Sequence, residues 1–530
     1  MSALIIAGIA LLLFFWGYGV YAKKLASLWQ IDPKRPTPAY TKYDSIDYVP
    51  AKNWLVLFGH HFASISGAGP IVGPVIAVIL WGWLPALIWV ILGTIFIGGV
   101  HDFGSLVTSV REGGSSIADI AANSISHRAK IIFSLFIWFA LILVIAVFAY
   151  LCAKTFTSEP KVVLPSLGLI PVALLVGTLL YRLRINTFLA TLFGLFCLVG
   201  LIWLANIFPI AVINIKVWII VLFIYAYIAS ILPVNILLQP RDYLASFLLF
   251  FGVGAGYIGL LISRPIISIP YYNKWSTSSG HLWPMLFVTV ACGAVSGFHA
   301  LISSGTSSKQ LSNERYARRI GYGGMVTEGI VAILAIITVG ILFKAGDDFQ
   351  GALKSLTPIG IFSKGYAVIT KEIFGGYGYL IAITILNAFI LTTLDTATRI
   401  SRYITEELFN IKNRYLSTLI IVVIGGVLAF SGKWSKIWPA FGASNQLVAA
   451  LALFVLSCWL LAKGRSIKFT IWPAFFMLVT TVAALIFQCF QYYAQRDLVL
   501  LMVSVILIIL AGSMVFETIP IIFLRRKQYA

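Results

Sequence analysis

The sequence predicts an all-α polytopic membrane protein that crosses the bilayer about fifteen times. Of its 530 residues, 60% are hydrophobic and only 11% are charged, and the mean hydropathy is +0.97. Apolar stretches of about 20 residues recur along the chain, each long enough to cross ~30 Å of hydrocarbon. A soluble protein of this length would need a larger charged surface.

Polar interruptions of the apolar runs set the approximate limits of the predicted spans. The spans are 2–22, 53–80, 82–106, 131–153, 163–181, 186–206, 217–234, 242–262, 283–304, 322–343, 376–397, 415–431, 438–462, 470–493 and 498–519. No basic residue precedes the first span and several follow it, so we expect a retained span rather than a cleaved signal peptide. The longest polar segments, 23–50 and 264–282, are predicted loops rather than soluble domains.

The distribution of charge predicts the topology. The formal charge is +20, but the basic residues are scattered over short loops, which is typical of a membrane protein and not of a nucleic-acid-binding domain. With the N-terminus outside, 26 of the 38 Lys and Arg residues, Arg241 among them, fall on inner loops. We therefore predict an outer N-terminus and a cytoplasmic C-terminus. The five cysteines lie in apolar segments without CxxC spacing, so we expect neither disulfides nor metal ligation.

The stretch GHHFASISGAGPIVGP, residues 59–74, puts two histidines and several helix breakers inside a predicted span. His60, Ser64 and Gly67 are spaced i, i+4, i+7 and share one helical face. The glycines and prolines that follow favour an unwound backbone, which a bilayer tolerates only where it lines a cavity or is buried. We predict a half-helix at a substrate site; the alternative is a proline kink with structural histidines. The candidate substrate-binding residues are His60, His61, Ser64, Gly67, Ala68, Gly69 and Pro70.

Other ionisable residues within spans are functional candidates, because each costs ~2.5–3.5 kcal/mol to insert. Glu328 has no basic residue within a helical turn, so it requires a tertiary partner or a bound proton. Asp395 and Arg399 lie four residues apart, which favours a structural ion pair over a coupling site. Arg241 and Asp242 follow a proline, and helix initiation with membrane anchoring is as well supported as a role in a site.

A polar stripe follows in residues 292–310, CGAVSGFHALISSGTSSKQ. Ser296, Ala300, Ser303 and Ser307 fall on one face. Small residues of this kind either allow close helix packing or coordinate a cation, and both interpretations stay open. His299 borders the stripe, where it either hydrogen-bonds to a neighbouring helix or belongs to a site.

Several segments, in order along the chain, resemble the carbon starvation protein family (CstA). They are GHHFASISGAGPIVGPVIA, GGVHDFGSL, QPRDYL, CGAVSGFHALISSGTSSKQ, RRIGYGGMVTEG, LTTLDTATR with SRYITEEL, and WPAFGASNQLVAAL, and they cover residues 54–450. The resemblance implies an inner-membrane secondary transporter, induced on nutrient limitation, that imports peptides or, in some members, pyruvate with protons. It also implies a core similar to the 5+5 inverted-repeat fold of LeuT-like symporters.

Under this resemblance, residues 1–22 form an N-terminal helix, 53–206 and 217–400 form the two repeats of a core at 53–400, and 413–530 form C-terminal helices. The second broken helix would then be span 217–234, interrupted by Pro233 and Asn235, which join the candidate substrate site. The SSGTSS segment would face the GAGP break and hold the cation. The candidate ion-coupling residues are Ser303, Ser304, Thr306, His299, Glu328, His101, Asp102 and Asp395.

Three classes of function fit these features. The first is a symporter driven by H⁺ or Na⁺, with a peptide or small carboxylate as substrate. The others are a passive channel or facilitator, and a transport-dead sensor, interaction protein or intramembrane enzyme. The sequence contains neither a Walker A motif nor HExxH, so we expect no enzyme, no cofactor and no metal site. The expected partners are the small-molecule substrate and the lipid bilayer, without nucleic acid, and the oligomeric state is open.

Overall fold

The computed structural model is largely helical, as the hydropathy pattern predicts. It describes residues 2–211, 214–344, 347, 348, 351, 353, 356–432 and 434–529, with the backbone alone for 181, 435 and 524–529. Within this part of the chain, 12 helices are long and apolar enough to cross a membrane, or up to 13 with one bent pair. Two further apolar helices are shorter, so all fifteen predicted spans coincide with helices but fifteen full-length spans are not confirmed.

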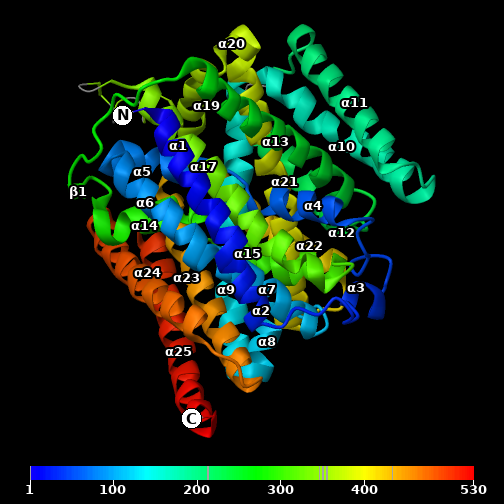
Figure 1. The fold of residues 1–530 in the computed structure, drawn as a ribbon, viewed down its shortest axis with the longest axis vertical. Helices are drawn as coiled ribbons and strands as arrows, with labels where there is room; N and C mark the ends of the chain where they lie inside the picture. The colour runs from blue at the N-terminus through cyan, green and yellow to red at the C-terminus, as the bar shows by residue number, and fades with distance from the viewer. Residues whose placement is uncertain are drawn as a thin grey trace.

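The helices of the first half run in chain order and are joined by short loops (Figure 1). They are α1 (Ala3–Trp16), α2 (Ala22–Leu28), α3 (Pro38–Thr41), α4 (Trp54–Ile65), α5 (Gly69–Trp81), α6 (Trp83–Gly93), α7 (Gly99–Arg111), α8 (Ile117–Ser124), α9 (His127–Ser158), α10 (Val163–Gly177), α11 (Thr187–Ile207), α12 (Ile215–Ile231) and α13 (Leu238–Ser263).

The second half begins with a small antiparallel hairpin, β1 (Ser276–Thr277) and β2 (Gly280–His281), in the predicted loop 264–282. The helices that follow are α14 (Phe287–Val290), α15 (Gly297–Ile302), α16 (Ser308–Gln310), α17 (Gly323–Leu342), α19 (Pro358–Ile369), α20 (Lys371–Phe374), α21 (Gly378–Phe409), α22 (Arg414–Phe430), α23 (Trp434–Ala462), α24 (Lys468–Ala494) and α25 (Leu498–Tyr529).

The GAGP segment does break its span. α4 ends at Ile65 and α5 begins at Gly69, and the two half-helices meet at a bend of 42°. The unwound part is shorter than the motif suggests, because α5 continues through Pro74. α4 begins after Asn53, whose side chain accepts a hydrogen bond from the Val56 amide and caps the helix.

A second break lies within the predicted span 283–304. α14 ends at Val290, Ala291 adopts φ +36°, and α15 starts only at Gly297. A non-glycine residue in this region of φ marks a forced interruption. The predicted second break is wrong in position: α12 ends at Ile231, so Pro233 and Asn235 lie in the connection to α13 rather than inside a span.

The two breaks pack directly against each other. A Cβ added to Gly73 of α5 would lie 2.5 Å from the Thr289 carbonyl oxygen and 2.6 Å from that of Val290, so only glycine fits there. Gly69 faces Cys292 in the same way. The glycines of the motif therefore serve close approach of two backbones as well as unwinding.

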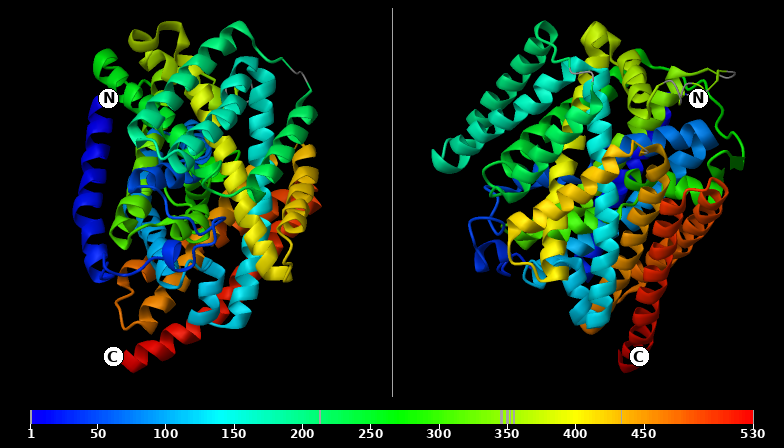
Figure 2. Two further views of the ribbon diagram at one scale, coloured as in Figure 1. Left: turned by 90° about the vertical axis from the view of Figure 1, so that its right-hand side faces the viewer. Right: turned by 180° about the vertical axis from the view of Figure 1, so that it is seen from behind.

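Four helices form the wall beside these breaks. α9 and α21, each of 32 residues, pack against each other, and α12 and α22 each contact both. α4 packs on α13, and α15 packs on α23. α10 and α11 pack together at the edge of the molecule, as Figure 1 and the right-hand view of Figure 2 show. Large apolar side chains such as Phe196 and Phe490 are more than 70% exposed on the periphery, whereas Arg241 and Asp395 are completely buried in the interior, as expected in lipid.

Candidate functional site

The adjacent histidines leave α4 in different directions and enter two separate clusters. His60 Nδ1 lies 2.7 Å from Asp242 Oδ2 on α13. His61 Nε2 lies 3.0 Å from Asp102 Oδ2 on α7, and its Nδ1 lies 2.8 Å from Ser307 Oγ. Neighbouring residues on a helix point about 100° apart, so one short motif supplies both clusters.

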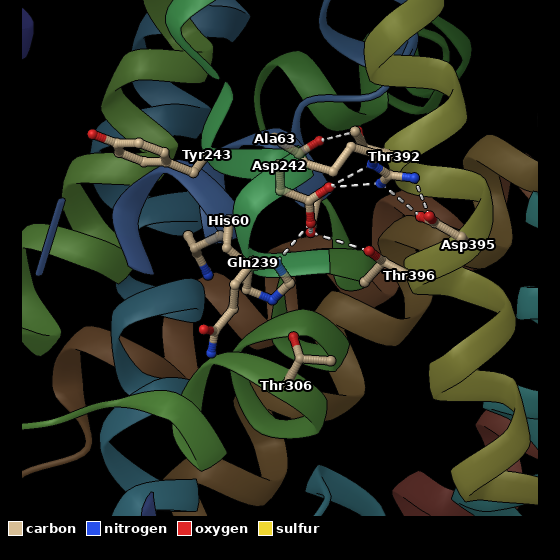
Figure 3. Close-up of polar contacts among 12 residues, drawn as sticks. His60, Ala63, Gln239, Asp242, Tyr243, Thr306, Thr392, Asp395 and Thr396 are labelled. Carbon is tan, nitrogen blue, oxygen red and sulfur yellow. Dashed lines mark hydrogen bonds and ion pairs between the residues drawn. The ribbon is translucent and has the colours of Figure 1, made fainter. Parts of the chain in front are cut away.

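The first group, here called the arginine cluster, consists of His60, Ser64, Arg241, Asp242, Asp395 and Thr396 (Figure 3). Its centre is Arg241, whose Nη2 donates to Asp242 Oδ1 at 2.6 Å and to Asp395 Oδ1 at 2.9 Å. The Tyr225 hydroxyl donates to Asp395 Oδ2 at 2.7 Å. Arg241, Asp242 and Asp395 are completely buried, so these charges have no solvent to screen them.

Hydroxyl groups of α21 dock on the last turn of α4. Thr392 donates to the Ala63 carbonyl at 2.8 Å, and Thr393 donates to the Ser64 carbonyl at 3.2 Å. The Ser64 hydroxyl lies 3.2 Å from that of Thr396 and donates to Asp242 Oδ2 at 3.3 Å. The carbonyls freed at the end of the half-helix are thus satisfied by the protein itself.

The arginine cluster lacks one positive charge. Arg241 faces two carboxylates, Asp242 and Asp395, so the cluster carries a net charge of −1 while His60 is neutral. The Gln310 amide nitrogen lies 3.2 Å from His60 Nε2 and can only donate, which puts the histidine proton on Nδ1, toward Asp242. A positive charge on His60 would therefore neutralise the cluster.

The second group, here called the histidine chain, consists of Ser307, His61, Asp102, Ser303, His299 and Glu328. Asp102 accepts a hydrogen bond from Ser303 and lies between two histidines, with His299 Nδ1 3.5 Å from its Oδ2. His299 Nε2 lies 2.7 Å from Glu328 Oε2. Glu328 therefore has the tertiary partner that its sequence context requires.

The SSGTSS segment does not face the GAGP break, contrary to the prediction. Ser303 and Ser307 contact Asp102 and His61, and the Ser304 hydroxyl accepts from the Ile117 amide. The reason is the break at 291–296, which places residues near Cys292 against α5 and carries the serines onward to α7. Thr306 hydrogen-bonds only to the carbonyl of its own helix, at Ile302.

The remaining candidates of the break are buried around it. A Cβ on Gly67 would lie 2.8 Å from Thr393 Oγ1 and 3.2 Å from the Phe148 ring, and Pro70 lies beside Gly293. Ala68 is the residue before α5. Gly67, Ala68, Gly69 and Pro70 thus share one place, between α9, α21 and the second break.

Pro233, Asn235 and His101 lie apart from these contacts. The Asn235 side-chain oxygen is buried without a hydrogen-bond partner among the described residues, and the Asn235 backbone carbonyl lies near Gly177 of α10. His101 is fully buried on α7 and has no hydrogen-bond partner at either ring nitrogen, although it is next to Asp102 in sequence.

The predicted ion pair between Asp395 and Arg399 is wrong. Asp395 pairs with Arg241, while Arg399 Nη1 donates to Asp47 Oδ1 at 2.9 Å. Arg399 also donates to the Ala229 carbonyl at 2.7 Å. The pairing fails because Arg241 of another helix reaches Asp395 while Asp47 reaches Arg399, and packing between helices decides which charges meet.

Sequence reasoning left Arg241 and Asp242 undecided and counted the arginine as a loop charge. α13 begins at Leu238, so both residues lie inside the helix and are fully buried. Gln239, Gln310 and the threonines of LTTLDT were missed as well. The one available signal was the run of polar residues in QPRDYL and LTTLDT directly beside long apolar runs.

Asp47, in the loop before α4, forms hydrogen bonds and ion pairs with side chains of α21. It accepts hydrogen bonds from Arg399 and from the Tyr403 hydroxyl, at 2.6 Å, and lies 3.4 Å from Arg402 Nη2. Burial alone would raise the pKa of Asp47, but the Arg399 and Arg402 guanidiniums outweigh it and lower that pKa to about 2.

We expect Asp47→Asn to lower the free energy of unfolding by about 2 kcal/mol at pH 7, because a depressed carboxylate pKa stabilises the fold above its ordinary value near 3.8. That contribution disappears as pH falls through about 2, so the difference from wild type should close on acidification. Chemical unfolding in detergent between pH 3 and 7 measures it. Asp32→Asn, in an exposed loop, should stay within about 0.5 kcal/mol of wild type. A pH-independent loss for Asp47→Asn would contradict the assignment.

Among the described residues, no group of three or more histidine, cysteine or acidic side chains is arranged to hold a metal ion. None of the five cysteines, all of which are described, forms a disulfide.

Two half-helix breaks packed together inside a bundle of apolar spans, with ion pairs buried beside them, define a multi-pass membrane transporter. The comparisons with known proteins agree. The chain belongs to the carbon starvation protein CstA family, whose family model matches residues 2–350 and 347–484. The resemblance seen in the sequence motifs is thereby confirmed.

The sequence alignments with its relatives cover most of this chain. The peptide transporter CstA of Campylobacter jejuni is 31% identical over 91% of this chain and 80% of its own length. The pyruvate/proton symporter BtsT of Escherichia coli K12 is 30% identical over 94% and 83%. Among solved structures, a mutant of the Eremococcus coleocola manganese transporter matches 91% of this chain and 99% of its own, with a TM-score of 0.57 at 12% identity. This last likeness concerns the fold alone.

Proposed function

We propose that this protein is a proton symporter of the inner membrane that imports peptides or a small carboxylate such as pyruvate. The substrate classes are those in the names of its relatives. The observation that carries the coupling is the arginine cluster, in which one guanidinium meets two carboxylates and His60 can supply the missing charge. A plain channel or facilitator has no need of buried ionisable groups, which are costly within a membrane.

The same cluster favours H⁺ over Na⁺ as the coupling ion. Carbonyls at the end of a half-helix are the groups that bind Na⁺ in broken-helix transporters. Here the Ala63 and Ser64 carbonyls accept hydrogen bonds from Thr392 and Thr393.

The substrate site is proposed at the two facing breaks. The first turn of α5 offers the positive end of a helix dipole, which suits the carboxylate that peptides and pyruvate share, although its Ile71 and Val72 amides donate to the Ala68 carbonyl. Gly67 lies beside Phe148 and Thr393, so an apolar ring and a hydroxyl flank the same place. His61 and Ser64 of α4 lie on the other side of the bend.

The packing supports two inverted repeats of five helices, divided differently from the boundary at 206–217. Between the two repeats, α9 corresponds to α21 and α12 corresponds to α22. The contact of α13 with α4 in the first repeat corresponds to the contact of α23 with α15 in the second. On this scheme the first repeat consists of α4/α5, α6–α7, α9, α12 and α13. The second repeat consists of α14/α15, α17, α21, α22 and α23. The α10–α11 hairpin, at the edge of the molecule, is then an insertion (Figure 1). α1 begins and α25 ends at opposite ends of the molecule, which accords with an outer N-terminus and a cytoplasmic C-terminus (Figure 2).

Uptake into proteoliposomes tests this function. Labelled pyruvate and labelled dialanine are offered under an inward proton gradient, an inward sodium gradient, or neither. We expect uphill accumulation of at least one substrate under the proton gradient alone, and its loss in His60→Asn, because asparagine keeps a hydrogen bond to Asp242 but cannot hold the proton. The matched control is His281→Asn, an exposed histidine of the β-hairpin.

Accumulation driven by sodium alone would contradict proton coupling. Downhill equilibration without proton movement would indicate a facilitator. Uptake that is unchanged in His60→Asn would remove the arginine cluster from the coupling mechanism.

A further inference from the structure

The histidine chain is a second group of buried ionisable side chains, separate from the arginine cluster. It includes two carboxylates, Asp102 and Glu328, and both are completely buried. No lysine or arginine lies within ion-pair distance of either in the described part of the chain, where their charged partners are His61 and His299. The arginine cluster, by contrast, has its own fixed cation.

Two unpaired carboxylates in a membrane interior cannot both stay ionised beside neutral histidines. An isolated buried charge costs several kcal/mol, and a group in that position binds a proton instead. Asp102 has two hydrogen-bonding partners: His61 Nε2 lies 3.0 Å from Asp102 Oδ2, and the Ser303 hydroxyl donates to Asp102 Oδ1. A proton is therefore required mainly at the other end, where Glu328 meets His299.

The contact between Glu328 and His299 is close but poorly bonded. His299 Nε2 lies 2.7 Å from Glu328 Oε2, yet both histidine nitrogens and both glutamate oxygens lack a hydrogen bond of good geometry. Buried polar atoms are nearly always satisfied, so orphan atoms on both partners mark a place where something is bound or exchanged. A proton bound at this pair neutralises the buried carboxylate that the contact leaves without a hydrogen bond.

The elements that hold this pair connect it to the breaks. His61 lies on half-helix α4 and His299 on half-helix α15, each beside one break. Asp102 and Glu328 lie on α7 and α17, which are continuous at those points. Movement of a half-helix therefore changes a histidine–carboxylate distance, and with it the affinity for a proton.

From this geometry we infer that Glu328 and His299 form a second proton-binding site, so that two protons accompany each substrate molecule. The inference rests on the proposed proton symport and deepens it. The other titratable groups that face the pair are His61 of α4, His101 and Asp102 of α7, and Cys292 of the second break. Asp102 and His61 stay paired with each other, and Glu328 is the group that gains and loses the proton.

The number of coupled protons is measured as an equilibrium accumulation ratio with the membrane potential clamped at zero. One pH unit multiplies accumulation about tenfold for each proton, since it corresponds to 1.36 kcal/mol. The expected ratio is thus about 100 for wild type and about 10 for Glu328→Gln, which keeps the shape but cannot titrate. His299→Gln should give the same value as Glu328→Gln. The matched control is Glu314→Gln: Glu314 is equally buried but held by Arg35 and Arg111, and its variant should retain the wild-type ratio.

A second measurement needs no substrate. Infrared difference spectra of the purified protein between acidic and alkaline pH should contain the carbonyl band of a protonated carboxylic acid. We expect this band to be lost in Glu328→Gln and retained in Glu314→Gln. If the wild-type protein transports neither pyruvate nor dialanine, the proposed function fails for those substrates. The infrared band then still shows whether Glu328 binds a proton.

Two results would overturn the inference. One is an accumulation ratio in Glu328→Gln equal to that of wild type. The other is an infrared difference spectrum of Glu328→Gln that keeps every carboxylic-acid band of wild type, since the proton would then reside elsewhere. Should Glu328→Gln fail to fold, the accumulation ratio of His299→Gln decides, and a wild-type ratio overturns the inference.

Discussion

Replacing Arg241 with glutamine is expected to abolish transport and to lower the free energy of unfolding by about 3–5 kcal/mol, the range for breaking a buried ion pair. The guanidinium is the one fixed cation between Asp242 and Asp395, all three of them fully buried. Without it, two carboxylates face each other across α13 and α21 with only His60 to neutralise them. Chemical unfolding in detergent and proteoliposome uptake measure the two effects.

Two further variants separate charge from geometry at this position. Arg241→Gln combined with Asp395→Asn removes one carboxylate with the cation, so stability should recover by about half while transport stays absent. Arg241→Lys keeps the charge but loses the planar fork that bridges both carboxylates, and should be intermediate in stability. Arg241→Gln with wild-type stability would show that the two carboxylates are already protonated, and would contradict the charge assignment.

Gly73→Ala is the second substitution with a large expected effect. The added methyl would meet two backbone carbonyl oxygens, at 2.5 Å and 2.6 Å, and backbone cannot move aside as a side-chain rotamer does. Overpacking of this kind costs about 1–3 kcal/mol in a well-packed core, and the upper end applies here because the two breaks would be forced apart. We also expect loss of uptake, because the proposed substrate site lies between those breaks.

The control for Gly73→Ala is Gly254→Ala on α13. Nothing lies within 4 Å of a Cβ at Gly254, and alanine is the better helix former by about 0.8–1 kcal/mol, so this variant should be at least as stable as wild type. Gel filtration and thermal unfolding in detergent compare the two variants. Equal behaviour would mean that the breaks are not in contact as described.

The membrane class and the helix positions follow from local properties of the chain. Each predicted span overlaps a helix because hydropathy over about 20 residues reflects an element's own contact with lipid. The break after α4 was predictable for the same reason, since glycine and proline act on the backbone where they stand. The second break was not: its CGAVSG sequence contains no proline, and the contact of Gly73 with Thr289 and Val290 belongs to two segments far apart in sequence.

In the candidate site as well, the sequence identifies the ionisable residues, and only the tertiary structure identifies their partners. Buried ionisable residues are visible in the sequence because they interrupt apolar runs, which is how His60, His61, Asp102, Glu328 and Asp395 were found. Their partners are not visible. The local rule predicts Asp395 with Arg399, four residues away, whereas Asp395 meets Arg241 across 154 positions.

Sequence alone thus establishes a bundle of membrane spans, one broken half-helix and a short set of charged residues that lipid does not tolerate. The tertiary structure assigned those residues to two clusters, one with an arginine and one without. Helix packing, and not spacing along the chain, determines which charges meet. His60 contacts Asp242, which is 182 residues away in the sequence, and His61 contacts Asp102, which is 41 residues away. In a medium without water, those pairings decide which groups remain charged and which must hold a proton.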